Sequence, residues 1–164
     1  MVDSVRPVDE DLRRFRAQLG RPAPRELEGA EPARDQLVRA FVRALERRDT
    51  ARLAAMAMNA AEFAYFYYPY TIYTHPPYTQ APGLVWLLTE QNGRKGLVRL
   101  LRRFQESRMD YRGYRCGRVE PQDLNLLHLD CGLLIGNDTV PARLFGTIIE
   151  RNGRFKFVSY SNGL

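Results

Sequence analysis

The hydrophobic pattern of the chain changes its period once, near residue 109, and this change limits the fold more than any other feature. Before it, apolar residues recur every three or four positions, as on one face of a helix. After it, apolar and polar residues alternate, as in half-buried strands. A run of helices followed by a run of strands is typical of the α+β class. The sequence therefore predicts N-terminal helices packed on a curved C-terminal antiparallel sheet.

The helical half divides into several segments. Residues 33–48 have one continuous apolar stripe and form the clearest predicted helix. Asp49 or Thr50 is a predicted N-cap for a further short helix, and Asn59 and Glu62 have the spacing of a capping box. Shorter or interrupted helices are predicted for residues 8–19 and for residues 82–104, the latter with a break near Asn92-Gly93.

Length and composition predict one domain with an appended N-terminal segment. The chain has 164 residues, 45% of them hydrophobic, which suffices for one packed core. Residues 1–32 are interpreted as a helix and a Pro/Gly-rich linker, and residues 33–164 as the main domain. No apolar run is long enough to span a membrane. The net charge of +6 comes from scattered arginines without interleaved aromatic residues, so no nucleic-acid partner is expected.

Four strands are predicted, at residues 109–119, 124–135, 140–151 and 154–161. Asn152-Gly153 is the strongest hairpin signal, and a two-residue turn at Asn137-Asp138 sets the expected register of the middle pair. A slip of one residue would exchange the two faces. The apolar face is expected to carry Leu129, Cys131, Leu133, Leu144, Ile148 and Phe157, and the other face His128, Asp130, Arg143, Phe145, Thr147, Lys156 and Tyr160.

The two cysteines are placed symmetrically about a predicted turn. The midpoint of Cys116 and Cys131 is position 123.5, inside the turn that joins the first two strands. Residues opposite each other in such a hairpin have Cβ atoms within about 4.5–5.5 Å, close to bonding range. The pair therefore predicts a disulfide, with two buried thiols as the alternative. A disulfide would favour an exported or periplasmic protein, or a lipoprotein, whose signal has been removed, over a cytoplasmic one.

Candidate site residues fall in two regions. His128 and Asp130 lie two apart on one strand, with Arg143 near, which is a minimal acid–base group or a plain Asp130–Arg143 salt bridge. Glu62 is either a buried functional carboxylate or a capping residue. An aromatic run at residues 63–78 is interpreted as core packing, a ligand pocket or an oligomer contact. The candidate ligand-binding residues are Tyr65, Tyr67, Tyr68, Tyr70, Trp86 and Arg143.

Several reaction classes lack their motifs. The sequence contains no GxGxxG, GxxxxGK[ST], HExxH or GxSxG pattern, so dinucleotide redox, NTP hydrolysis and serine-hydrolase chemistry are poorly supported. Two cysteines and two distant histidines lack zinc spacing, and no metal or cofactor is expected. No catalytic residue is assigned; Asp130, His128 and Glu62 are the weak candidates.

The order of elements resembles the nuclear transport factor 2-like superfamily, a cystatin-like α+β cone shared with ketosteroid isomerase and polyketide cyclases. A long helix ends in Arg47-Arg48-Asp49, a short helix begins at Asp49, and a curved sheet ends the chain. The resemblance covers about residues 33–162 and rests on topology. It implies a pocket between sheet and helices, and often a homodimer. In isomerase-like members a carboxylate is the base and a tyrosine lies near an oxyanion, roles that Asp130 and Tyr65, Tyr67 or Tyr68 would take.

These observations predict a non-enzymatic domain that binds a small apolar or aromatic ligand, or a protein partner, in a pocket between sheet and helices. The alternative is a small isomerase or dehydratase that uses a pocket carboxylate and a tyrosine. The many arginines, 23 against 2 lysines, are typical of a bacterial protein from a GC-rich genome.

Overall fold

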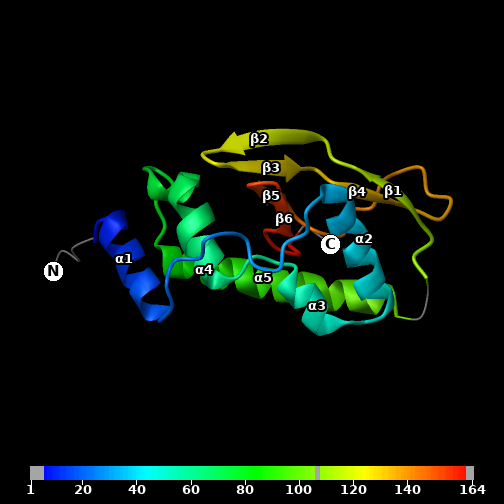
Figure 1. Ribbon diagram of the computed structural model, residues 1–164, viewed down its shortest axis with the longest axis horizontal. Helices are drawn as coiled ribbons and strands as arrows, with labels where there is room; N and C mark the ends of the chain where they lie inside the picture. The colour runs from blue at the N-terminus through cyan, green and yellow to red at the C-terminus, as the bar shows by residue number, and fades with distance from the viewer. Residues whose placement is uncertain (1–5, 106–107, 162–164) are drawn as a thin grey trace.

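The computed structural model describes residues 6–105 and 108–161 and confirms the α+β class (Figure 1). Helices fill the N-terminal half, and antiparallel strands fill the C-terminal part. The helices are α1 (Val8–Gln18), α2 (Arg34–Glu46), α3 (Thr50–Ala55), α4 (Ala60–Glu62) and α5 (Pro82–Arg103). Between α4 and α5 lie a π-helical turn, η1 (Phe63–Tyr67), and the 3-10 turns η2 (Tyr68–Tyr70) and η3 (Ile72–Thr74). In the described part of the chain, no helix is long and apolar enough to cross a bilayer.

The helix starts follow the capping signals. The Asp49 carboxylate accepts a hydrogen bond from the backbone nitrogen of Arg52 at 3.0 Å, at the start of α3. Asn59 and Glu62 form the predicted capping box at the start of α4, with side-chain-to-backbone distances of 2.8 and 2.9 Å. Both short helices are therefore fixed locally, before packing acts.

The predicted break in residues 82–104 is wrong, because α5 continues from Pro82 to Arg103. Gly93 and Gly96 instead lie where the C-terminal segment crosses the helix. A Cβ built on Gly96 would lie 2.0 Å from the carbonyl oxygen of Tyr160, whereas one on Gly93 would meet Ser159 at an ordinary 3.6 Å. Gly96 therefore permits a close backbone approach, and its missing side chain is a packing feature rather than a helix stop.

The strands are shorter and more numerous than predicted. They are β1 (Tyr111–Arg115), β2 (Arg118–Gln122), β3 (Asn125–Leu129), β4 (Gly132–Ile135), β5 (Ile148–Arg151) and β6 (Arg154–Phe157). β1 pairs with β4, and the other four follow the order β2-β3-β5-β6. The first two predicted strands are thus one long hairpin, interrupted on both arms near the cysteines. Asn152 and Gly153 both have positive φ, at 52° and 70°, and form the expected tight turn between β5 and β6.

The predicted division of the sheet faces is wrong for Phe145 and Tyr160, which are buried in the same core as Ile148 and Phe157. It is also wrong for His128. His128 pairs with Ile148, and Ile148 pairs with Phe157, so these three side chains share a face. The cause is one extra residue: between the Leu133–Ala142 bridge and the His128–Ile148 pair, the four residues 129–132 face the five residues 143–147. The alternation of side chains therefore changes phase within this loop.

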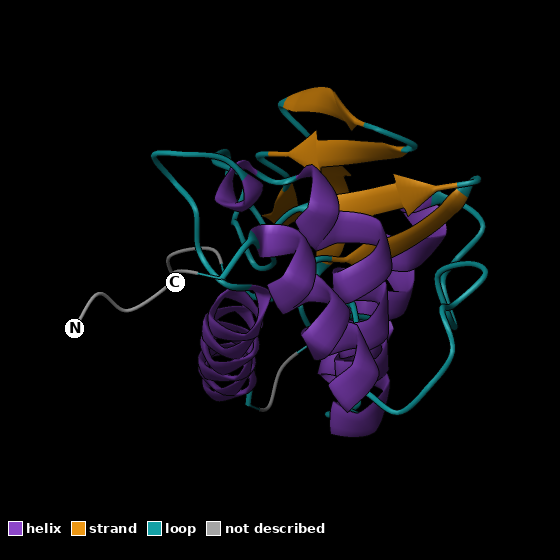
Figure 2. Cartoon of the chain, turned by 90° about the vertical axis from the view of Figure 1, so that its left-hand side faces the viewer, coloured by secondary structure: helices purple, strands orange, loops and turns teal. Residues whose placement is uncertain are grey.

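Both faces of the β3-β5-β6 region are covered. One faces a core around Phe41 of α2, with Ile148 and Phe157, and the other faces a core around Phe63, with Ile149. Figure 1 shows α5 along the long axis beneath the strands, and Figure 2 shows the same arrangement from the side of α1. A sheet buried on both faces places any polar residue of its central rows inside the protein.

The N-terminal segment packs on the second core. Leu12 of α1 and Leu27 of the following loop are buried there, at 9% and 2% exposure. Phe15 contacts the ring of Phe63 edge-on, with centroids 6.1 Å apart. Glu31 then exchanges two backbone hydrogen bonds with Phe155 of β6, at 3.1 and 2.9 Å. The loop after α1 is therefore tied to the sheet edge before α2 begins.

Candidate functional site

A cavity of about 670 Å³ lies between the α3–α4 region, α5 and the C-terminal residues 156–160. Its position differs from the region expected to hold a ligand, because neither His128 nor Asp130 lines it. Of the candidate ligand-binding residues, Trp86 lines it. Most of its remaining wall is apolar, from Ala54, Ala55, Ala57, Met58, Ala60, Leu97 and Val158.

One ion pair is buried beside this cavity. Lys156 lines the wall from β6, and its Nζ lies 2.7 Å from Oε1 of Glu62. Both side chains are almost fully buried, at 3% and 0% exposure. Lys156 lies in the β6 row opposite Ile149 and therefore faces the second core, whereas the capping box of α4 holds Glu62 in place.

The Glu62 carboxylate accepts three hydrogen bonds from the protein. Oε1 accepts from the backbone nitrogen of Asn59 at 2.9 Å and from Lys156, and Oε2 accepts from the backbone nitrogen of Glu28 at 2.7 Å. Glu62 is thus both the capping residue and the buried carboxylate that the sequence offered as alternatives. Three charge-assisted hydrogen bonds offset the cost of burying its charge.

Other polar groups at the wall are engaged within the protein. The Tyr160 hydroxyl donates to the carbonyl of Leu53 at 2.5 Å, and the Thr89 hydroxyl donates to the carbonyl of Val85 at 2.7 Å. Burial raises the pKa of Tyr160 well above its usual value, which keeps the hydroxyl neutral and donating. The Asn59 side chain caps α4 and donates to Glu28.

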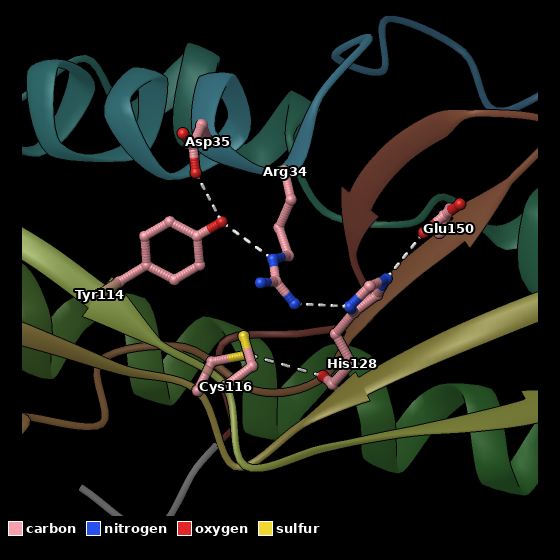
Figure 3. Close-up of a disulfide and its surroundings, with 7 residues drawn as sticks. Arg34, Asp35, Tyr114, Cys116, His128 and Glu150 are labelled. Atoms are coloured by element: carbon pink, nitrogen blue, oxygen red, sulfur yellow. Dashed lines mark hydrogen bonds and ion pairs between the residues drawn. A yellow bond between two sulfur atoms is a disulfide. The ribbon is translucent and has the colours of Figure 1, made fainter.

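His128 belongs to a separate network that joins α2 to the hairpin (Figure 3). Nη1 of Arg34 lies 2.8 Å from Nδ1 of His128, and Nε2 of His128 lies 2.8 Å from Oε1 of Glu150. Arginine only donates, so Nδ1 accepts and Nε2 carries the proton that is donated to Glu150. Both ring nitrogens are occupied, which suits a structural tie better than proton transfer.

The same arginine extends the network to the first strand. Nε of Arg34 donates to the hydroxyl of Tyr114 at 2.8 Å, and that hydroxyl donates to Asp35 at 2.8 Å (Figure 3). Burial, the largest influence, raises the pKa of Tyr114. The network therefore fixes the N-terminus of α2 against both arms of the hairpin, beside the disulfide.

The disulfide is formed between Cys116 and Cys131, as predicted from the symmetry of the pair. It lies between the β1–β4 and β2–β3 ladders, whose pairs Arg115–Gly132 and Arg118–Leu129 flank it in one continuous register. Asp130, with φ of 56°, bends the second arm at this point. The covalent bond thus joins the arms where the ladder is interrupted.

Asp130 lies at the surface and faces arginines. Its carboxylate is 3.6 Å from Nη1 of Arg143 and 3.5 Å from Nε of Arg118, and its side chain is 44% exposed. This is the plain salt bridge that the sequence offered as an alternative to acid–base chemistry. His128 contacts Arg34 and Glu150 instead of Asp130.

The aromatic run is mainly a core element. Tyr68 is fully buried and donates its hydroxyl to the carbonyl of Gln80 at 2.6 Å, whereas Tyr70 is exposed. Burial raises the pKa values of Tyr67 and Tyr68. Tyr65 lies under the guanidinium of Arg16, 4.2 Å from the ring centroid, and lines a second, smaller cavity of about 390 Å³. Among these tyrosines, none lines the larger cavity.

Sequence reasoning placed Lys156 on the polar face but did not select it as a site residue. Its burial has no signal in the sequence, because a lysine between Phe155 and Phe157 has the alternation of a half-buried strand with its polar side in water. Arg34 and Tyr114 have no signal either, because their contact joins residues 80 positions apart.

The described residues contain no group of three or more His, Cys, Asp or Glu side chains that could hold a metal ion. Comparisons of the chain with family models, with curated proteins and with solved structures return no match.

Proposed function

We propose that this protein binds a small, mainly apolar molecule in the cavity between α3, α4, α5 and residues 156–160. The observation that carries the proposal is a hollow of about 670 Å³ with a mainly apolar wall and a buried ion pair beside it. Ligand sites in proteins commonly have volumes of about 300–1,000 Å³, apolar walls and a few placed polar groups. The resemblance to the nuclear transport factor 2-like superfamily, whose members commonly hold a pocket between helices and sheet, supports the same proposal.

The isomerase or dehydratase alternative has less support. A general base needs a lone pair directed at the substrate. Asp130 is exposed and faces two arginines, and Glu62 is already bound by three protein donors. Ligand binding without chemistry requires neither group to act as a base, and it is the function that this geometry favours.

Trp86 provides the test, because it is the single tryptophan of the chain and lines the cavity. We expect 2-octanone and 1-octanol, which absorb little where tryptophan does, to change its fluorescence in a saturable manner. A response that stays linear up to the solubility limit of both probes would refute the proposal.

A pair of variants separates binding in the cavity from binding elsewhere. Ala54 and Ala51 both lie in α3, but only Ala54 lines the cavity. We expect Ala54→Phe to weaken the binding of both probes and Ala51→Phe to leave it unchanged. Equal effects of the two substitutions would place the probes outside the cavity.

We also propose that the protein resides in an oxidising compartment, because reducing compartments keep cysteine pairs as thiols. The disulfide between Cys116 and Cys131 supports this location. Alkylation of free thiols in intact producing cells, before lysis, is expected to leave both cysteines unmodified. Alkylation of both would place the protein in a reducing compartment.

A further inference from the structure

Every charged side chain of the cavity wall has a partner of opposite charge. Lys156 pairs with Glu62, Glu90 with Arg94, and Glu28 with Arg21 outside the wall. The site as a whole is therefore close to neutral. An anionic ligand would place an uncompensated charge against an apolar wall, where charge burial is costly. A neutral ligand meets no such cost.

Lys156 nevertheless has hydrogen-bonding capacity left. An ammonium carries three N–H donors, and the carboxylate of Glu62 takes one of them. Within residues 6–105 and 108–161, no second hydrogen-bond partner of Nζ is present. Tyr160 and Thr89 donate their hydroxyl protons to backbone carbonyls. Ser159 accepts at its Oγ from the backbone of Ser161 in an exposed turn, so its hydroxyl proton remains available. The indole N–H of Trp86, which also lines the cavity, likewise has no partner among the described residues.

The ion pair also decides what kind of chemistry Lys156 performs. An amine attacks a carbonyl carbon only through a free lone pair, and the ammonium beside Glu62 has none. The group therefore acts as a hydrogen-bond donor toward an oxygen rather than as a nucleophile. A charged donor in an apolar setting binds a neutral oxygen more strongly than a neutral donor would.

From these contacts, and resting on the proposed binding function, we infer that the ligand is an uncharged apolar molecule with one oxygen acceptor, a ketone or a hydroxyl. Lys156 donates to that oxygen while keeping its bond to Glu62. The ammonium selects for a ligand that carries an oxygen acceptor, and the apolar wall contacts the hydrocarbon part of that ligand.

Three matched probes test this inference by titration calorimetry: 2-octanone, its isostere 2-methyl-1-octene, in which a methylene replaces the oxygen, and octanoate. A hydrogen bond to a charged group corresponds to about a ten- to hundredfold change in affinity. We expect 2-octanone to bind tighter than the alkene by about that factor, and tighter than octanoate.

Two variants assign the preference to a residue. Lys156→Met combined with Glu62→Gln removes both charges together, and its folding is checked by circular dichroism. We expect this double variant to bind the ketone and the alkene equally. Ser159→Ala, which removes the hydroxyl donor of Ser159, is expected to keep the preference of the native protein. If the double variant does not fold, a preference that is lost in Ser159→Ala still overturns the role of Lys156, and a preference that is kept excludes the serine hydroxyl.

The outcomes separate this inference from the proposed function. Equal binding of ketone and alkene by the native protein overturns the inference that the ligand carries an oxygen acceptor, but it is still consistent with an apolar binding site. Tighter binding of octanoate overturns the preference for an uncharged ligand. Loss of the preference in Ser159→Ala assigns the donor to Ser159 and overturns the role of Lys156. Failure of all three probes to bind refutes the binding function itself.

Discussion

Reduction of the disulfide is the perturbation whose size follows most directly from the structure. Cys116 and Cys131 are 15 residues apart in sequence, and closing a loop of that length restricts the unfolded chain by about 3 kcal/mol. The folded protein keeps its strand pairing when the bond opens, because the flanking ladders hold the two arms in register. We therefore expect reduction to lower the free energy of unfolding by about 3 kcal/mol.

Urea unfolding of the native chain, oxidised and reduced, measures this difference on one sequence. Thermal unfolding gives a second measurement. For a chain of this length, 1 kcal/mol shifts the melting temperature by about 2–4 °C, so we expect reduction to lower it by about 6–12 °C. A variant with Cys116→Ala and Cys131→Ala is the control, since the described chain has no free cysteine and this variant has nothing left to reduce. A loss below about 1 kcal/mol on reduction would refute the loop-closure argument.

Three further predictions concern the packing of the cavity region. Gly96→Ala forces a Cβ against the backbone of Tyr160 and is expected to lower the free energy of unfolding in urea by about 1–3 kcal/mol or more. Gly93→Ala in the same helix should raise it by about 0.5–1 kcal/mol. A gain in stability from both substitutions would contradict the close contact at Gly96. Lys156→Met leaves the charge of Glu62 buried without its partner and is expected to lower the free energy of unfolding, measured by thermal unfolding, by about 3–5 kcal/mol. Adding Glu62→Gln should restore part of this stability. No restoration would show that the two side chains act independently. Because burial raises the pKa of Tyr160 above that of the unfolded chain, its contribution to stability is complete below about pH 10 and falls as the pH rises further, by up to about 1.4 kcal/mol per unit. Tyr160→Phe should make alkaline unfolding curves less steep, and an unchanged slope would contradict the assignment.

Local signals predicted much of this structure. The change of period near residue 109 gave the α+β class, and Asp49, Asn59 and Glu62 start helices where their side chains cap backbone nitrogens. Asn152-Gly153 forms its turn because both residues tolerate positive φ. The cysteine pair is the longest-range feature that could be predicted, since a hairpin register follows from its turn. In each case the determining contacts lie within a few residues, or follow from one turn.

Tertiary structure determined where the cavity lies and which side chains surround it. One extra residue among 143–147 changed the phase of the sheet, which placed His128 on the face of Ile148 and Phe157 instead of the face that carries Lys156. A helix break was predicted near Asn92-Gly93, and the role of Gly96 was not predicted, because a sequence does not show which backbone will cross a glycine. The ion pair beside the cavity joins residues 94 positions apart. The sequence alone determined where helices, turns and the disulfide form, because neighbouring residues fix them. Only the packed fold determined which charges are buried together and where the chain leaves a hollow, because those depend on how distant segments fill space.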